Sequence, residues 1–187
     1  MKNVLILHGT QATSKSNWFT WLSDELKKKG FRVWLPDLPN AELPSLTGIN
    51  KFIFSNKDWK FNSDSIIVGH SSGAIAILSI LSELPENTVL DKCILVSYFT
   101  KESLGGKWEL NAKLFDYNFD FAKIKNKAKK FIIVHSDNDP YAPLEDAKAL
   151  AEKLGGELIV KKDQGHFNLE KGEQYRQFPF LLELIGE

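Results

Sequence analysis

The residues best suited to chemistry in this chain stand in one short turn, Gly69-His70-Ser71-Ser72-Gly73. An apolar run, residues 66–68, precedes the turn and is typical of a buried strand, and helix-forming residues 74–84 follow it. Glycines on both sides of a serine let the backbone fold sharply and expose the hydroxyl. We therefore expect Ser71 to be a nucleophile. The alternative is a strand-to-helix turn without chemistry.

A serine hydroxyl becomes a good nucleophile only when a base takes its proton and an acid orients that base. His166 lies in the loop 163–167, just past the last predicted strand and on the same edge of the sheet as Ser71. We therefore predict His166 as the base. Each of the other three histidines has a simpler structural interpretation, because it ends a strand or lies in the turn itself. These are His8, His70 and His135.

The candidate acids are two aspartates in the segment Ser136-Asp137-Asn138-Asp139-Pro140, which follows the fifth predicted strand. Asp137 lies nearer the strand and could cap the turn through an Asx hydrogen bond. Asp139 lies farther out, before a proline that favours an extended backbone. We favour Asp139, with Asp137 as the competing candidate and a turn or capping role as the alternative for either.

Strands and helices alternate along the chain, and this order positions the three candidates. Runs rich in apolar residues predict strands at residues 4–7, 31–35, 66–68, 93–96 and 131–135, and a weaker one at 158–161. Helices are predicted at residues 17–29 (capped by Asn17), 72–84 and 144–154, near Ile49 to Ile53, and from Tyr175 or Pro179 to Ile185. This alternation indicates an α/β fold with a parallel sheet between two helical layers, and such sheets bind ligands beyond the carboxyl ends of their strands.

Composition narrows the possible partners. The chain of 187 residues suits one domain spanning 1–187, and its 24 basic and 24 acidic residues leave no net charge to attract nucleic acid. Cys93 is the single cysteine, so no internal disulfide can form. No stretch has the 18 apolar residues of a membrane span, and no signal peptide is evident. We expect a cytoplasmic protein that binds neither nucleic acid nor membrane.

The connection after the fourth predicted strand is longer than one crossover helix requires. We interpret residues 97–123 as a small lid or pocket wall over Ser71, although its aromatic residues could equally pack a loop and a helix onto the sheet. Trp108 and Phe115 from this segment, together with Trp18, are our candidates for binding a modest apolar acyl group.

The candidates occur in the chain order Ser, Asp, His, which is the order found in α/β-hydrolases. The sequence resembles the small serine hydrolases of that superfamily, the family that includes the retinoblastoma-binding protein 9 type and the bacterial YdeN-like proteins. Four segments carry the resemblance and span residues 8 to 167 of the chain. They are His8-Gly9-Thr10, Gly69 to Ala74, Asp139-Pro140 with Pro143, and Gly165-His166-Phe167.

The resemblance implies a compact α/β-hydrolase with six parallel strands in the order 2-1-3-4-5-6. It implies Ser71 as nucleophile, His166 as base and Asp139 as acid, and so supports Asp139 over Asp137. The strand order places the loop after the first strand beside the serine turn.

That adjacency suggests an oxyanion hole made by two backbone N–H groups. One would come from Ser72, the residue after the nucleophile, and the other from Thr10, with Gln11 as the next choice.

These residues predict hydrolysis of a small ester, thioester or activated amide through an acyl-enzyme, with a small-molecule acyl substrate as the partner. We expect no metal and no cofactor, because the chain contains no His-Glu-x-x-His, Cys-x-x-Cys or nucleotide-binding pattern. Two alternatives remain. One is a non-catalytic interaction module that retains the fold, and the other is a peptidase acting on aminoacyl amides.

Overall fold

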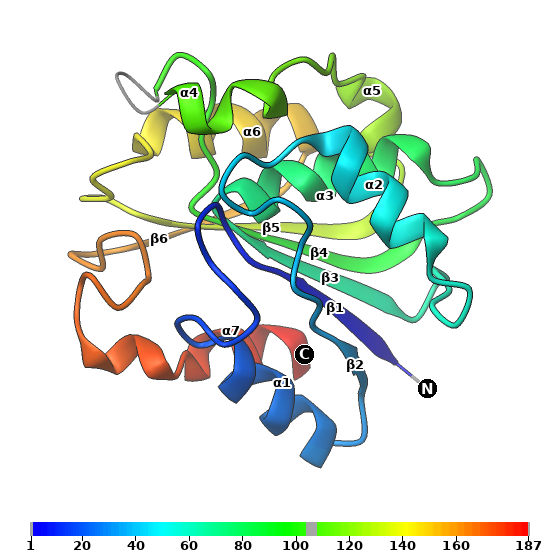
Figure 1. Cartoon of the computed structure of the whole chain (residues 1–187), viewed down its shortest axis with the longest axis horizontal. Helices are drawn as coiled ribbons and strands as arrows, with labels where there is room; N and C mark the ends of the chain where they lie inside the picture. The colour runs from blue at the N-terminus through cyan, green and yellow to red at the C-terminus, as the bar shows by residue number, and fades with distance from the viewer. Residues whose placement is uncertain (1, 104–107, 187) are drawn as a thin grey trace.

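The computed structural model describes residues 2–103 and 108–186. Within this part of the chain, six strands form one all-parallel sheet in the order β2-β1-β3-β4-β5-β6 (Figure 1). This confirms the predicted fold class and strand order. The strands are β1 (Asn3–Leu7), β2 (Arg32–Trp34), β3 (Ser65–His70), β4 (Leu90–Val96), β5 (Ala128–Ser136) and β6 (Glu157–Lys161).

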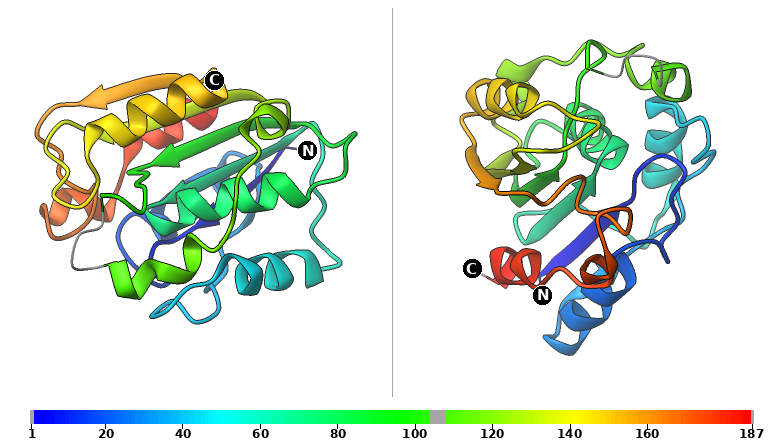
Figure 2. Two further views of the ribbon diagram at one scale, coloured as in Figure 1. Left: turned by 90° about the horizontal axis from the view of Figure 1, so that it is seen from above. Right: turned by 90° about the vertical axis from the view of Figure 1, so that its left-hand side faces the viewer.

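Helices cover both faces of the sheet. In Figures 1 and 2, α1 and α7 lie on one face, whereas α2, α3 and α6 lie on the other. None of the helices in the described part of the chain is long and apolar enough to span a bilayer. The helices are α1 (Phe19–Lys28), α2 (Leu46–Ser55), α3 (Ser72–Glu83), α4 (Trp108–Asn111), α5 (Phe121–Ile124), α6 (Leu144–Leu154) and α7 (Pro179–Gly186), with short 3₁₀ helices η2 (Ala112–Leu114) and η3 (Glu173–Arg176).

The two helical layers explain why the central strands are built from apolar runs. In β1, Val4 and Ile6 face the core shared with α1 and α7, while Leu5 and Leu7 face the core shared with α2 and α3. All four side chains are completely buried. Since successive residues of a strand point to opposite faces, a strand covered on both faces requires an uninterrupted apolar run.

The long connection between β4 and β5 packs onto the α3 and α6 side of the sheet. Leu114 and Ile124 are completely buried there, and α5 contacts both α3 and α6. Phe99, just after β4, is also buried in this core. The aromatic side chains of this segment that the structure describes therefore pack onto this core. Its role as a lid stays a prediction.

The beginning of α1 differs from the predicted start. We expected Asn17 to cap a helix running to residue 29, but α1 starts at Phe19 and ends at Lys28. Asn17 instead has a positive φ of 48°, and its Oδ1 accepts a hydrogen bond of 3.1 Å from the backbone N–H of Leu169. Asn tolerates this backbone region better than most residues. The Asn17 side chain thus links the segment before α1 to the loop after β6.

The turn after β3 depends on very close backbone contacts. A Cβ atom on Gly69 would lie 2.4 Å from the carbonyl oxygen of Gly73, and one on Gly73 would lie 2.5 Å from the carbonyl oxygen of Leu7. These contacts bring the start of α3 against both β3 and β1. Only glycine leaves room for them, because any added carbon would meet rigid backbone rather than a movable side chain.

We predict that Gly73→Ala lowers the free energy of unfolding by about 1–3 kcal/mol, the usual cost of overpacking a tight site. Urea unfolding measures this loss. Gly186→Ala is the matched control, because a Cβ atom there meets open space, and it should show no loss of stability. Equal stability of the two variants would contradict the role given to the Gly73 contact.

Candidate active site

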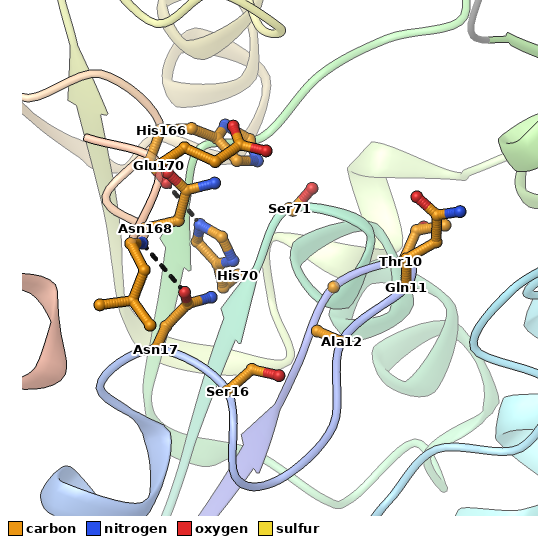
Figure 3. Close-up of a pocket in the computed structure, with 12 residues that line it drawn as sticks. Thr10, Gln11, Ala12, Ser16, Asn17, His70, Ser71, His166, Asn168 and Glu170 are labelled. Carbon is orange, nitrogen blue, oxygen red and sulfur yellow. Dashed lines mark hydrogen bonds between the residues drawn. The ribbon is translucent and has the colours of Figure 1, made fainter. Parts of the chain in front are cut away.

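Ser71 stands at the junction of β3 and α3 in a rare backbone conformation. Its φ of 57° and ψ of −123° belong to the sparsely populated regions that cost on the order of 1–3 kcal/mol. Its N–H donates a hydrogen bond of 2.9 Å to the carbonyl of Val96 at the end of β4. The side chain lines a cavity of about 310 Å³, shown in Figure 3. This conformation is the strained strand-to-helix turn expected of an exposed nucleophile.

Gly9, after β1, lies directly against this serine. A Cβ atom on Gly9 would be 2.9 Å from Ser71 Cβ and 3.4 Å from Ser71 Oγ. The loop after β1 therefore forms one wall of the cavity. It reaches the serine this closely only because Gly9 has no side chain.

His166 and Asp139 form the expected pair. Nδ1 of His166 lies 2.8 Å from Oδ2 and 3.0 Å from Oδ1 of the Asp139 carboxylate. The Asp139 side chain is fully buried, and Oδ1 also accepts from the backbone N–H groups of Tyr141 and Ala142 at 3.0 and 3.1 Å. An ionised carboxylate only accepts hydrogen bonds, so Nδ1 carries a proton, and in the neutral imidazole Nε2 is then the nitrogen with the lone pair.

The surroundings of Asp139 keep its carboxyl group ionised. Burial alone would raise its pKa, but the hydrogen bond and charge of His166 and the backbone N–H of Tyr141 outweigh burial and lower it. Ser97 contributes to this lowering. The buried hydroxyl of Ser97 makes no hydrogen bond of normal geometry among the described residues, but it lies close enough to the Asp139 carboxylate to favour the charged form of that group.

The competing aspartate has a different role. Asp137 Oδ1 accepts a hydrogen bond of 2.8 Å from the N–H of Asp163, and its own N–H donates to the carbonyl of Lys161. The side chain is exposed and joins the loop after β5 to the loop after β6. Asp137 is thus a turn residue, and the aspartate that contacts the imidazole is Asp139.

Ser71 and His166 line the same cavity but do not touch through a hydrogen bond. The two residues come from the loops after β3 and β6 and face the same opening in Figure 3. Within the described part of the chain, the Ser71 hydroxyl makes no hydrogen bond to a protein group. The structure therefore forms the His166–Asp139 half of the predicted relay and leaves the Ser71–His166 half open.

The loop after β1 also brings Thr10 beside the start of α3. Thr10 Oγ1 is hydrogen-bonded to Ser72 Oγ at 2.9 Å and to Asn111 Oδ1 at 2.6 Å. These bonds connect three separate segments around Ser71. The N–H of Gln11 is already used, since it donates to the carbonyl of Ala41 at 2.8 Å.

Comparison with known proteins decides the family. The model of the serine hydrolase family matches residues 4–186. The chain belongs to this family. YdeN of Bacillus subtilis (strain 168) is 29% identical over 193 residues, covering 98% of this chain and 94% of YdeN. The serine hydrolase RBBP9 of Rattus norvegicus is 28% identical over 169 residues, covering 88% and 86%.

Solved structures agree with this membership. The crystal structure of YdeN from B. subtilis matches with a TM-score of 0.90 and 29% identity, covering all of this chain and 97% of that chain. Est1E of Butyrivibrio proteoclasticus, solved with ferulic acid bound, matches with a TM-score of 0.69 and 18% identity, covering 100% and 90%. The second likeness concerns the fold alone.

The other histidines of this serine hydrolase are neutral and structural. Nε2 of His8 accepts from the N–H of Leu38 at 2.8 Å, so the proton lies on Nδ1, which donates to the carbonyl of Gly9 at 2.9 Å. His135 bonds the carbonyl of Ala142 through Nε2 at 2.9 Å. Burial lowers the pKa of both residues. Burial and the neighbouring His166 lower the pKa of His70 to about 3.

The predicted substrate-binding residues need correction. Trp18 is completely buried and packs against Phe19 and Phe178, so it cannot contact a substrate. Phe115 packs behind Phe99 on the core and does not line the cavities beside Ser71. Trp108 begins α4, but its side chain lies outside the described part of the structure. Aromatic residues in a loop often pack inward, and sequence alone does not show which do.

The side chains that do line the site are mostly polar. Sequence reasoning placed Thr10 and Gln11 at the site but missed the others, although Asn168 and Glu170 follow His166 within four residues, which is the signal that could have found them. Among residues 2–103 and 108–186, no cluster of three His, Cys, Asp or Glu side chains is arranged to hold a metal ion. Polar side chains lining the two cavities that contain Ser71 include Thr10, Gln11, Ser16, Asn17, Asn111, Tyr141, Asn168 and Glu170.

We predict that the protein loses stability as the pH falls below about 6.5, the ordinary pKa of histidine. His8, His70 and His135 have lowered pKa values when folded, so the unfolded chain binds more protons between those values and 6.5. The free energy of unfolding has its full value above about pH 6.5. Below that pH, each of these histidines lowers it by up to about 1.4 kcal/mol per pH unit, down to the pKa of that histidine in the folded protein. Asp139 adds to the loss only at lower pH.

Urea unfolding between pH 7.5 and 4.5 measures this dependence. His135→Gln is the informative variant, because its amide can still donate to Ala142 but does not titrate. It should show a shallower loss than the parent. A free energy of unfolding that does not change between pH 7.5 and 4.5 would contradict the neutral state assigned to these histidines.

Proposed function

We propose that this serine hydrolase cleaves a small polar ester, thioester or activated amide through an acyl-enzyme on Ser71. The observation that supports this most directly is the hydrogen-bonded His166–Asp139 pair at the rim of the cavity that Ser71 enters from a strained turn. These are the nucleophile, base and acid of a serine hydrolase, arranged in three loops at one edge of the sheet.

In the first step, Ser71 Oγ attacks the substrate carbonyl carbon while Nε2 of His166 takes the hydroxyl proton. Asp139 fixes Nδ1 as the protonated nitrogen, so that Nε2 is the one able to accept. The carboxylate then stabilises the imidazolium. His166 returns the proton to the leaving group, and water releases the acyl group by the reverse sequence.

The oxyanion formed in this step would be bound by the backbone N–H groups of Ser72 and Thr10. Ser72 is the first residue of α3, where N–H groups lack intrahelical partners and the helix dipole favours negative charge. The bond from Gln11 N–H to Ala41 leaves Thr10 as the better second donor. The side-chain bonds of Thr10 to Ser72 and Asn111 hold its backbone in place.

The missing hydrogen bond between Ser71 and His166 is compatible with this mechanism. Catalytic hydrogen bonds are often long or misaligned without substrate and tighten in the Michaelis complex. Both side chains line the same cavity, so we expect them to approach each other when substrate binds there.

The lining of the site favours a polar substrate over the modest apolar acyl group predicted from sequence. Among the residues that the structure describes, Glu170 is the only acidic or basic one, apart from histidine, that lines the two cavities containing Ser71. Its Oε2 accepts a hydrogen bond of 2.7 Å from the hydroxyl of Tyr141. A fixed carboxylate with amide neighbours suits a substrate that carries hydrogen-bond donors or a positive charge.

We predict that Ser71→Ala reduces turnover of p-nitrophenyl esters by on the order of 10³-fold or more without unfolding the protein. Asp139→Asn should also lose activity, because an amide neither holds the neutral imidazole in the required tautomer nor stabilises the imidazolium. Asp137→Asn is the matched control, because the Asp137 side chain bonds the loop after β6 and not the imidazole, and it should stay near the parent rate.

Full activity of folded Ser71→Ala would reject the proposal. Loss of activity in Asp137→Asn but not in Asp139→Asn would reject the assignment of the acid. Retained binding of a small molecule with no turnover of esters, thioesters or aminoacyl arylamides would favour a non-catalytic module.

We predict that Glu170→Gln lowers kcat/KM for esters bearing an ammonium group by about 5- to 50-fold relative to neutral esters of the same size, the usual range for one partly exposed charge contact. The carboxylate attracts the cation, whereas the amide of Gln keeps the size and the bond to Tyr141. An unchanged ratio of the two kcat/KM values would show that Glu170 does not select substrate charge.

A further inference from the structure

The loop that carries His166 has little regular structure of its own. Three of its residues have positive φ values: Asp163 at 56°, Gly165 at 57° and Phe167 at 50°. Two of these are not glycine, so the loop adopts a backbone that its own residues do not favour. Contacts with other segments must therefore hold it in the shape that places the imidazole.

Three buried or partly buried side chains hold this loop by its backbone. Nε2 of His70 is 2.7 Å from the carbonyl oxygen of His166, and Nε1 of Trp18 donates to the carbonyl of Phe167 at 2.9 Å. Asn17 accepts from the N–H of Leu169 at 3.1 Å. Figure 3 shows the contacts of His70 and Asn17 as dashed lines beneath the base.

We propose that His70 is a positioning residue that sets the catalytic imidazole relative to the nucleophile. This inference rests on the proposed function of Ser71 and His166. His70 precedes Ser71 in the chain and bonds the main chain of His166 directly, so one rigid segment fixes both reacting groups. It does so without touching the substrate carbon or transferring a proton.

The chemistry of His70 suits this role. A carbonyl oxygen only accepts, so Nε2 of His70 must carry its proton, and the residue is only 3% exposed. Its ring centroid lies 4.8 Å from that of His166, which becomes positively charged during the reaction. A second charge at this distance would oppose that imidazolium. His70 stays neutral at working pH because burial and His166 lower its pKa to about 3.

Trp18 provides a second and separate support for the same loop. Its ring packs edge-on against His70, with centroids 5.9 Å apart, and against Phe178 at 5.7 Å. The residue predicted from sequence to bind substrate thus supports the base from behind. His70 differs from Trp18 because it is the chain neighbour of Ser71, so its bond joins the loop directly to the segment that carries the nucleophile.

The test combines His70 variants with the loss of the base itself. His70→Met removes the N–H donor, and His70→Asn keeps a polar group too short to reach the His166 carbonyl. His70→Gln can still donate from a similar position. In the parent background, Met and Asn should lower kcat about 10- to 100-fold with KM changed less than about 2-fold, as for other groups that orient a catalytic residue. Gln should recover most of the loss.

The same three substitutions in a His166→Ala background decide how His70 acts. His166→Ala keeps the carbonyl that His70 bonds but lacks the imidazole. If His70 works by positioning that imidazole, the residual rate should change less than about 2-fold in this background. If circular dichroism shows that the His70→Met variant does not fold, the His70→Asn variant is measured in its place.

Three results would overturn the proposal: unchanged kcat in both His70→Met and His70→Asn, no recovery by His70→Gln, or an equal loss with and without His166. The last result would mean that His70 acts on Ser71 or on folding. Failure of the proposed function itself looks different, because His166→Ala alone would then leave the rate unchanged.

Discussion

The structure depends on a steric constraint at the turn after β3. Ser71 occupies a strained backbone conformation, and this is possible only because α3 starts in contact with β3 and β1. The contacts at Gly69 and Gly73 are too short for any other residue. The rest of the sheet supplies the energy that holds the strain, since the apolar runs of the central strands are buried on both faces.

The distribution of charge around this turn follows from burial. Asp139 stays ionised inside the protein because His166 and two backbone N–H groups compensate for the loss of water. The buried histidines at the ends of β1, β3 and β5 stay neutral because burial disfavours the charged ring and outweighs the opposing effect of their backbone hydrogen bonds. His166 alone bonds a carboxylate. The positive charge that develops in the proposed reaction therefore has one stable position.

Sequence reasoning succeeded where one rule of topology decides the outcome. Parallel strands end at the same edge, so Ser71, Asp139 and His166 could be grouped before any distance was known, and the observed strand order agrees. It failed for Trp18 and Phe115, because the direction in which a loop aromatic packs depends on contacts between distant segments. For the same reason Asn17 looked like a helix cap, although its partner is Leu169 at the other end of the chain.

The polar lining of the site was also beyond sequence reasoning. In the sequence, nothing distinguishes Glu170 and Asn168 from ordinary surface residues. They line the cavity because the loop after β6 folds back over it. That folding is set by main-chain bonds from His70 and Trp18, which no local pattern records. The selectivity and positioning that we propose thus depend on long-range contacts, whereas the proposed reacting groups lie at strand ends.

The measurement that tests the central claim most directly is a crystal structure of the protein after reaction with a fluorophosphonate. We expect phosphorus bonded to Ser71 Oγ, its oxygen accepting from the N–H groups of Ser72 and Thr10, and His166 still bonded to Asp139. A label on another residue, or a phosphoryl oxygen directed away from both N–H groups, would contradict the account.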